Sequence, residues 1–387
     1  MRWVSTAAST NHLEDALDEA LDSLAADLAG ATPDLVLAFA HVGYASHFSR
    51  LPRLLRRRYP GVTLLGCLAE GIIGGGEEYE QMPALSLTAA VLPGVAIHPF
   101  HLGGRPETWR SRIDVAPEQD PSFLLMPDRH TCPADVLVRW FDAVYPDSVK
   151  LGGLAGGGMD AGTTALLVGD QIVRSGAVGV ALSGNIEVET AVAQACRPVG
   201  TPLFITRAED ELIFELDGVP ALDAIEAIYT DLSDIEQQQF RQALFLGLAT
   251  DDDRAPPEHG HFLVRDILAV EPSTGAIAVS SDIDDTRVVQ LHLRDGEAAS
   301  LALGGVLAEC RDPAPAGALL FTGVDRGEAL FGFPNHDADC LFDRYGEVPV
   351  GGFFGSGEIG PISDRERHTV VHGHAAAFAL FRPASSR

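Results

Sequence analysis

Three copies of one thirteen-residue pattern occur in the sequence: YPGVTLLGCLAEG at 59–71, YPDSVKLGGLAGG at 145–157 and YGEVPVGGFFGSG at 345–357. Tyr stands first in each copy, and Gly stands eighth and last. An apolar run of strand length precedes each copy: LVLAFA from Leu35, FLLM from Phe123 and ALLF from Ala318. Because a repeat fixes the architecture around its motifs, the pattern predicts duplicated strand–helix–strand units, each ending in a glycine-rich turn.

Other segments predict helices and paired strands around these units. The run LEDALDEALDSLAADL predicts an amphipathic helix whose apolar stripe is Leu13, Ala16, Leu17, Ala20, Leu21, Leu24 and Leu28. Further helices are expected at 51–58 and 134–145, within the first two units. A hairpin around Pro93-Gly94 is expected from strands at 84–91 and 95–100, followed by a loop at 102–120 and a meander at 163–184.

Strands outnumber helices in this interpretation, and hairpins are mixed with crossover connections. That combination favours a mixed α/β (α+β) fold, in which duplicated units form mixed β-sheets flanked by helices. The segment Asp217-Gly218-Val219-Pro220 leads from a strand through a turn into a helix. We therefore predict two domains, at 30–220 and 221–374.

Composition excludes several classes of function. The 387 residues carry 55 acidic against 27 basic side chains, a net charge of −28, and Lys150 is the only lysine. Such a charge argues against nucleic acid and anionic membranes as partners. There is no apolar run long enough for a membrane span, and no apolar core of a signal peptide. The five cysteines are scattered and never spaced C-x-x-C, so we expect a reduced, cytoplasmic location without a structural zinc site.

The glycine-rich turns are the first candidate site. Glycines allow a ligand to approach the backbone closely, and successive N–H groups can hold a carboxylate or a phosphate. The positions concerned are Gly66, Gly71, Gly152, Gly153, Gly156, Gly352 and Gly357. The alternative is that a repeated tight turn simply requires glycine. No Walker A loop and no GxGxxG before a helix is present, so the sequence gives little support to nucleotide binding.

Charged residues beside the turns are the second candidate. Glu358 follows the third turn, with Ser356 two positions before it, and could bind an amine or orient a guanidinium such as that of Arg326. Glu70 occupies the corresponding stretch of the first turn. The alternative for Glu358 is a structural pair with an arginine or with the backbone. Cys67 could be a nucleophile or a ligand for haem or metal; its counterparts are Gly153 and Phe353, which favours a small buried cysteine.

Histidines offer a third possibility. His-Gly-His occurs at His259/His261 and at His372/His374, and residues i and i+2 of a strand share a face that could hold a metal. No cysteine or carboxylate recurs at ligand spacing, so a metal site is not favoured. His336-Asp337 are adjacent in sequence, and adjacent side chains usually point apart. No nucleophile elbow or Ser/His/Asp order is found, so nothing in the sequence demands catalysis.

Several of these passages resemble the FIST sensory domain, in both its N-terminal and C-terminal parts. The resemblance is carried by LGCLAEGI, LGGLAGGG, AQACRPVGTPLFITRAEDELIFELDGVPAL, FLVRDIL, VVQLHLRD, FTGVDRG and GGFFGSGEIGPI, and it extends from about 33 to 374. ELDGVPAL and GGFFGSGEIGP are its most specific parts. The chain departs at FTGV, where family members often have a cysteine near Thr322, so no thiol-dependent role is implied there.

The resemblance implies a sensor of small ligands, with amino acids or related metabolites as the suspected class. It also implies that Arg265, Arg294, Asp295, Arg326, Gly352, Gly357 and Glu358 are pocket or framework positions. No signalling module accompanies the family match, so we expect the output to pass through a separate signalling protein. The full set of expected ligand-binding residues is Gly66, Cys67, Glu70, Gly71, Gly152, Gly153, Gly156, Arg265, Arg294, Arg326, Gly352, Phe353, Ser356, Gly357 and Glu358.

The leading hypothesis is therefore a cytoplasmic small-ligand sensor without catalytic activity and without a resident cofactor or metal. A haem-binding gas sensor, with His372 or His261 as axial ligand, is the first alternative. An enzyme that uses Glu358 or Cys67 is the second. The sequence does not identify the ligand, the signalling partner or the oligomeric state.

Overall fold

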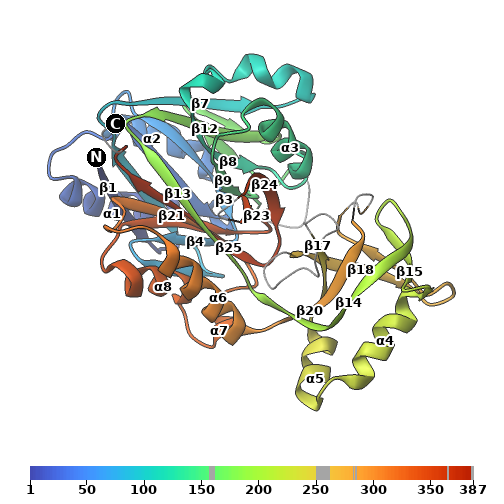
Figure 1. The fold of residues 1–387 in the computed structure, drawn as a ribbon. Helices are drawn as coiled ribbons and strands as arrows, with labels where there is room; N and C mark the ends of the chain where they lie inside the picture. The colour runs from blue at the N-terminus through green and yellow to red at the C-terminus, as the bar shows by residue number, and fades with distance from the viewer. Residues whose placement is uncertain (157–161, 250–261, 282, 284–285, 364–365, 385–387) are drawn as a thin grey trace. The chain divides into compact units, whose positions relative to one another are not determined.

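The computed structural model describes residues 1–156, 162–249, 262–281, 283, 286–363 and 366–384. Two compact units are present (Figure 1). The first unit comprises residues 1–193, 303–371 and 375–387, and the second comprises 194–302 and 372–374. The second unit is thus an insertion into the first, and the position 220/221 falls within it.

Each repeat forms two parallel strands joined by a helical connection, and the mixed α+β fold predicted from the sequence is confirmed. The first repeat consists of β2 (Leu35–His41), α2 (Leu51–Arg58) and β3 (Thr63–Ala69). The second consists of β8 (Ser122–Pro127), α3 (Ala134–Val144) and β9 (Lys150–Gly153). The third consists of β21 (Gly317–Gly323), α7 (Glu328–Phe331), α8 (His336–Tyr345) and β22 (Val350–Gly355).

An antiparallel strand flanks each parallel pair on either side. Beside the first strands of the repeats lie β6 (Leu85–Val91), β12 (Ala177–Gly184) and β25 (Ala375–Arg382). Beside the second strands, β10 (Leu166–Val168) pairs with β3, β23 (Glu358–Ser363) with β9, and β4 (Gly71–Gly74) with β22. The strand after each glycine turn therefore joins the sheet of a different repeat. This exchange interlocks the three sheets of the first unit.

Further strands extend these sheets at their edges. They are β1 (Arg2–Ala8) and β11 (Gln171–Val173) in the first sheet, β7 (Val95–Leu102) and β24 (Glu366–His372) in the second, and β13 (Glu187–Gln194) and β5 (Glu77–Glu80) in the third. The predicted hairpin around Pro93-Gly94 is wrong, although both its strands exist. β6 pairs with β1 and β2, whereas β7 pairs with β12. The turn carries the chain from one sheet to another.

Two other expectations need correction. In the predicted meander, β10 and β11 form a hairpin, but β12 belongs to a different sheet. The segment expected to be a loop at 102–120 contains the 3₁₀ helices η3 (Pro106–Arg112) and η4 (Pro117–Gln119), and Trp109 of η3 is buried. The strand β1 was not predicted, because nothing in the local pattern of RWVSTAA distinguishes it.

The eighth position of the repeat requires glycine for a steric reason. Each of these glycines lies opposite a residue of the neighbouring parallel strand. A Cβ atom would lie 1.9 Å from the carbonyl oxygen of Ala38 at Gly66, 1.8 Å from that of Leu125 at Gly152, and 1.8 Å from that of Leu320 at Gly352. No Cβ atom can be accommodated at such distances. Close packing of the two strands explains this part of the pattern without a ligand.

Aromatic side chains from different repeats meet in the core of the first unit. The ring of Phe353 lies 5.2 Å from that of Phe39 and 5.2 Å from that of Phe321. Cys67 is completely buried in the same cluster. The predicted helix is confirmed as α1 (Leu13–Leu28), and its buried residues are the seven of the predicted stripe.

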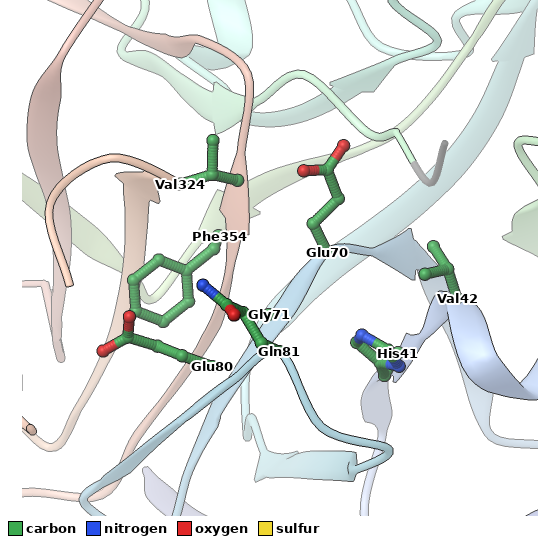
Figure 2. A pocket seen from close by; sticks show the side chains of 8 residues that line it. All are labelled: His41, Val42, Glu70, Gly71, Glu80, Gln81, Val324 and Phe354. Atoms are coloured by element: carbon green, nitrogen blue, oxygen red, sulfur yellow. The ribbon is translucent and has the colours of Figure 1, made fainter. Parts of the chain in front are cut away.

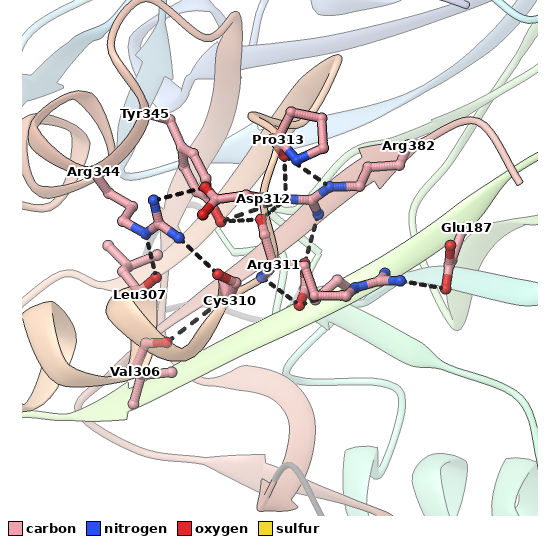
Figure 3. A network of polar contacts seen from close by, with 11 residues as sticks. Glu187, Val306, Leu307, Cys310, Arg311, Asp312, Pro313, Arg344, Tyr345 and Arg382 are labelled. Atoms are coloured by element: carbon pink, nitrogen blue, oxygen red, sulfur yellow. Dashed lines mark hydrogen bonds and ion pairs between the residues drawn. The ribbon is translucent and has the colours of Figure 1, made fainter. Parts of the chain in front are cut away.

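A network of arginines surrounds Tyr345 at the end of α8 (Figure 3). The guanidinium groups of Arg344 and Arg382 lie 4.3 and 5.9 Å from the centre of the Tyr345 ring. Arg382 also donates to the carbonyl oxygens of Arg311 and Pro313. These bonds connect β25 to the segment that leads into β21.

The second unit is built on one sheet of seven strands among the described residues, in the order β14-β20-β17-β18-β19-β15-β16. Their bounds are β14 (Cys196–Glu209), β15 (Leu212–Leu216), β16 (Val219–Pro220), β17 (Leu244–Ala249), β18 (Phe262–Glu271), β19 (Ala276–Val279) and β20 (Val288–Arg294). β14 also pairs with β15, so the sheet curls back on itself. Helices α4 (Ala221–Asp231) and α5 (Asp234–Gln242) pack against this sheet, and α6 (Gly296–Glu309) leads back into the first unit.

Candidate functional site

A cavity of about 410 Å³ lies in the first unit, at the ends of strands from the first and third repeats. Its lining residues are His41, Val42, Glu70, Gly71, Glu80, Gln81, Val324 and Phe354 (Figure 2). In Figure 2, Phe354, Val324 and Glu80 stand on one side and His41 and Val42 on the other, with Glu70 between them. A volume of this size matches a small organic ligand.

The topology explains why these residues meet. His41 is the last residue of β2, and Glu70 follows β3 directly. Val324 follows β21, the first strand of the third repeat. The carboxyl ends of parallel strands are the usual place for ligands in sheets of this type. The exchange of β4 into the third sheet unites the strand ends of these two repeats in one cavity.

The apolar wall depends on a glycine. Gly71 in β4 lies opposite Phe354 in β22. A Cβ atom at Gly71 would lie 2.7 Å from Cδ2 of Phe354, so the phenyl ring can lie across the strand only because residue 71 lacks a side chain. Phe354 is only 2% exposed. The ring is therefore held in a fixed position within the wall of the cavity.

His41 is in its neutral form with a defined tautomer. Its Nδ1 atom accepts a hydrogen bond from the backbone N–H of Gly43 at 3.0 Å. An accepting Nδ1 carries no proton, so Nε2 carries it. Burial lowers the pKa of His41, and the negative charge of Glu70 only partly opposes this effect. The imidazole is therefore uncharged at neutral pH and offers one N–H donor.

The remaining polar groups of the cavity are two carboxylates and an amide. Glu70 has intermediate exposure. Glu80 ends β5, and its Oε1 atom accepts a hydrogen bond of 2.8 Å from the N–H of Glu328 at the start of α7. Gln81 follows Glu80 directly, with a left-handed backbone (φ 50°). No lysine or arginine is among the lining residues, so the charge of the cavity is negative.

A buried polar network lies in the third repeat. Arg326 forms two hydrogen bonds with Asp337, 2.9 Å from Nε to Oδ2 and 2.8 Å from Nη2 to Oδ1. The Thr322 hydroxyl donates to Oδ2 of Asp337 at 2.8 Å, and His336 Nδ1 lies 2.9 Å from Oδ1. Although burial opposes it, the Arg326 guanidinium holds the pKa of Asp337 well below its usual range. The adjacent residues His336 and Asp337 thus point toward one another, contrary to the usual expectation for neighbours.

Glu78 connects β5 to this network. Its backbone N–H donates to Oδ1 of Asn335 at 2.7 Å, and its Oε1 atom accepts from the N–H of Ala338 at 2.8 Å. Two groups at the start of α8 are satisfied in this reciprocal way. Burial raises the pKa of Glu78 to about 8, and repulsion by Asp337 adds to the effect.

The predicted residues of the first unit lie in different places: some line the cavity, and others pack between strands or in the core. Glu70 and Gly71 line the cavity. Gly66, Gly152 and Gly352 pack against neighbouring strands, Gly153 lies against the Phe353 ring, and Cys67 and Phe353 are in the core. Burial raises the pKa of the Cys67 thiol, the opposite of the shift that activates a nucleophile. Of the third turn, Ser356 is exposed and Gly357 is buried.

Glu358 and Arg326 lie in buried structure next to the third turn. Glu358 is 0% exposed, and its Oε2 atom accepts from the backbone N–H of Ala375 at 3.0 Å. The negative charge of Glu358 also helps to raise the pKa of Arg326, after the larger effects of burial, which lowers it, and of Asp337. Gly156, at the end of the second turn, has the Arg129 side chain 3.0 Å from the position of a Cβ atom. None of these three residues lines the cavity.

The other predicted residues belong to the second unit. Arg265 is 8% exposed and donates to the carbonyl oxygen of Val264. The Arg294 guanidinium lies 5.4 Å from the centre of the Phe245 ring. His372 is buried, and Nε2 of His374 lies 3.2 Å from Oδ1 of Asp266. His259 and His261 lie outside the described residues. No group of His, Cys, Asp and Glu side chains in the described part of the chain is arranged to hold a metal ion.

Most residues of the cavity were not predicted from the sequence. His41, Val42, Glu80, Gln81, Val324 and Phe354 were not among the expected residues. His41 and Val324 follow predicted strands directly, so the rule of strand ends could have found them. Phe354 is adjacent to the expected Phe353, and neighbouring residues of a strand face opposite sides. Nothing local to Glu80 and Gln81 signals that β5 reaches the third sheet.

Two models of the same protein family match this chain, one after the other along the sequence. The family model of the FIST N domain matches residues 34–219, and that of the FIST C domain matches residues 221–361. An uncharacterised protein of Mycobacterium tuberculosis is 35% identical over 367 residues, which cover 92% of this chain and 93% of that protein. An uncharacterised protein of Mycobacterium bovis is 33% identical over 381 residues, 96% of this chain and 97% of that protein.

Two further similarities are weaker. An F-box/LRR-repeat protein of Arabidopsis thaliana is 37% identical over 78 residues, 18% of this chain and 15% of that protein. Among solved structures, a cyanuric acid hydrolase matches over 99% of this chain and 100% of its own, with 10% identity and a TM-score of 0.31. That TM-score is too low for a shared fold or activity to be inferred. Within the described residues, no helix is both long enough and apolar enough to cross a membrane.

Proposed function

The chain belongs to the FIST family, and we propose that it is a cytoplasmic sensory protein that binds a small metabolite in the cavity of the first unit. The observation that carries this proposal is the cavity itself. It lies at the carboxyl ends of parallel strands, and polar groups from the first repeat face an aromatic wall from the third. Cavities that bind small molecules commonly combine an apolar lining with a few polar groups.

The proposal also includes the cellular compartment and the way in which ligand binding is passed on. The five cysteines form no disulfide, which supports a reducing compartment. A ligand that contacts both β4 and β22 would favour the conformation in which these strands are paired, and it would shift the population toward that state. We propose that a separate protein reads this state.

Catalysis is the second candidate, because a neutral imidazole and a carboxylate in one cavity are suited to proton transfer. The chain offers no partner for them there: none of the lining residues is Ser, Thr, Cys or Lys. Cys67 is buried in the core, and Glu358 is engaged with the backbone. Binding without turnover is therefore the better supported function.

A thermal-shift panel of amino acids, amines, keto acids and nucleotides tests the proposal. At 100 times its Kd, a ligand adds about 2.7 kcal/mol to the free energy of unfolding, which raises Tm by several degrees. Val324→Trp should abolish the shift, since Val324 is 44% exposed and lines the cavity. Leu301→Trp is the control, because Leu301 is 71% exposed and is not a lining residue. A panel without any shift, or a shift that survives in Val324→Trp, would contradict the proposal.

A further inference from the structure

We infer that the ligand of this cavity is a cation, an amine or amidine with an attached apolar group, and not a carboxylate or a phosphate. This inference rests on the proposed function and specifies its ligand class. It departs from the expectation that N–H groups of the glycine turns would hold a carboxylate or a phosphate.

The balance of charge around the cavity is the first argument. Glu70 and Glu80 bring two carboxylates, while His41 is held neutral by the Gly43 N–H and by burial. Unlike charges attract and like charges repel, and both effects are stronger in a half-buried cavity than in bulk water. An anionic ligand would meet this repulsion from both carboxylates, whereas a cation would be attracted by both. The net charge of −28 acts in the same direction over longer distances.

Arg326, two residues after Val324, cannot reverse this balance of charge. Arg326 is 1% exposed, and both Nε and Nη2 are bonded to Asp337. Its positive charge is compensated within the buried network. An anion in the cavity would therefore face no available cationic side chain among the lining residues.

The hydrogen-bonding groups add a second, independent argument. Glu70 lines the cavity with intermediate exposure and offers two acceptor oxygens. Oε1 of Glu80 is already used by the Glu328 N–H. The donors are the Nε2–H of His41 and the amide of Gln81. Acceptors carrying negative charge thus dominate, which suits a ligand that donates several N–H bonds.

The aromatic wall specifies the rest of the ligand. Phe354 is fixed against Gly71, and Val324 and Val42 add aliphatic surface. An aromatic or branched aliphatic group would pack there, and an ammonium group near the phenyl ring would gain cation–π attraction. The chemistry of the cavity thus fits an arylalkylamine or a related amidine.

Calorimetric titration with three compounds of nearly equal shape tests the inference. These are phenethylamine, a cation at pH 7.5, the neutral 2-phenylethanol, and the anion phenylacetate. Phenethylamine should bind at least about tenfold more tightly than the other two, which corresponds to about 1.4 kcal/mol of binding free energy. Raising NaCl from 20 to about 300 mM should weaken the amine but not the alcohol.

Substitutions of the two lining carboxylates test whether they cause the preference for the amine. Glu70→Gln should weaken phenethylamine about tenfold or more and leave 2-phenylethanol unchanged. Glu80→Gln retains an acceptor for the Glu328 N–H and should act in the same direction. Glu118→Gln is the matched control, because Glu118 is exposed in η4 and is not a lining residue.

The possible outcomes separate this inference from the proposed function. If phenylacetate or 2-phenylethanol binds as tightly as the amine and Val324→Trp removes that binding, the cavity binds ligands but the assignment of a cation is overturned. Equal affinity of wild type and Glu70→Gln for the amine would overturn it as well. If neither these compounds nor any member of the thermal-shift panel binds, the proposed function itself fails.

Discussion

Two glycines of this chain, Gly352 and Gly304, have opposite surroundings. A Cβ atom at Gly352 would lie 1.8 Å from the carbonyl oxygen of Leu320, and its backbone has a φ of +151°. Gly304 lies in the interior of α6, with nothing within 4 Å of the position of a Cβ atom. The sequence alone shows glycine at both positions, and only the repeat separates the required one from the dispensable one.

The first prediction uses this pair. Gly352→Ala should lower the free energy of unfolding by about 3 kcal/mol or more, because overpacking against a rigid backbone cannot be relieved. Gly304→Ala should raise it by about 0.5–1 kcal/mol, since alanine is the better helix former. Urea unfolding of both variants measures these changes. Equal effects in the same direction would refute the steric explanation of the repeat.

The second prediction concerns the pH dependence of stability. The folded-state pKa of Glu78 is raised from 4.5 to about 8, so between these values the folded protein binds more protons than the unfolded chain. The contribution of Glu78 to the free energy of unfolding must therefore fall as the pH rises from about 4.5 through about 8. At about 1.4 kcal/mol per pKa unit, the loss amounts to a few kcal/mol.

Glu78→Gln should remove this loss, because the amide still accepts from Ala338 but does not ionise. The variant should be more stable than wild type at pH 9, with a flatter curve of stability against pH. Glu118→Gln, which changes an exposed carboxylate, should retain the slope of wild type. Urea unfolding at several pH values decides the matter, and a slope unchanged in Glu78→Gln would show that Glu78 is not the titrating group.

At the scale of elements, the sequence predicted what is local and failed where partners are distant. Helices α1 and α2 follow from apolar spacing and charge, and the three parallel pairs follow from the repeat. The exchange of β4, β10 and β23 between sheets could not be predicted. A strand pairs with whichever sheet edge is open to it in the fold, and no residue of the strand itself encodes that choice. The cavity depends on this exchange, which explains why Glu70 and Gly71 were expected but Glu80 and Phe354 were not.

The third prediction belongs to the packing of β25. Arg382 is 8% exposed and pairs with Glu189 of β13. It also donates to the backbone carbonyl oxygens of Arg311 and Pro313 (Figure 3). Arg382→Met retains most of the volume but leaves Glu189 and the carbonyl oxygens with fewer partners, so we expect a loss of about 2–4 kcal/mol. Arg50→Met breaks an exposed pair with Glu14 and should cost much less than Arg382→Met, because exposed ion pairs contribute little to stability. Similar losses in both variants, measured by urea unfolding, would disprove the structural role of Arg382.

At the scale of the whole molecule, the order of the chain conceals the organisation of the fold. The family models divide the chain near residue 220, whereas the second compact unit runs from 194 to 302 with residues 372–374. A turn followed by a helix, as at 217–221, marks a change of element, but it does not show whether the two elements pack in the same core. The third repeat returns to the first unit because its strands complete sheets begun by the other two.

The last prediction follows from the total charge. With 55 acidic and 27 basic residues, at least 28 negative charges have no positive partner even if every cation is paired. Salt weakens both the attraction within exposed pairs and the repulsion among the excess charges. Exposed pairs contribute only about 0–1 kcal/mol each, so the repulsion should dominate.

Tm should therefore rise as NaCl increases from 20 to about 300 mM, where the Debye length falls below about 10 Å. The same salt should weaken phenethylamine binding, because one ionic atmosphere screens both interactions. A Tm that falls with salt would mean that paired charges, and not the excess of carboxylates, govern the electrostatics of this protein.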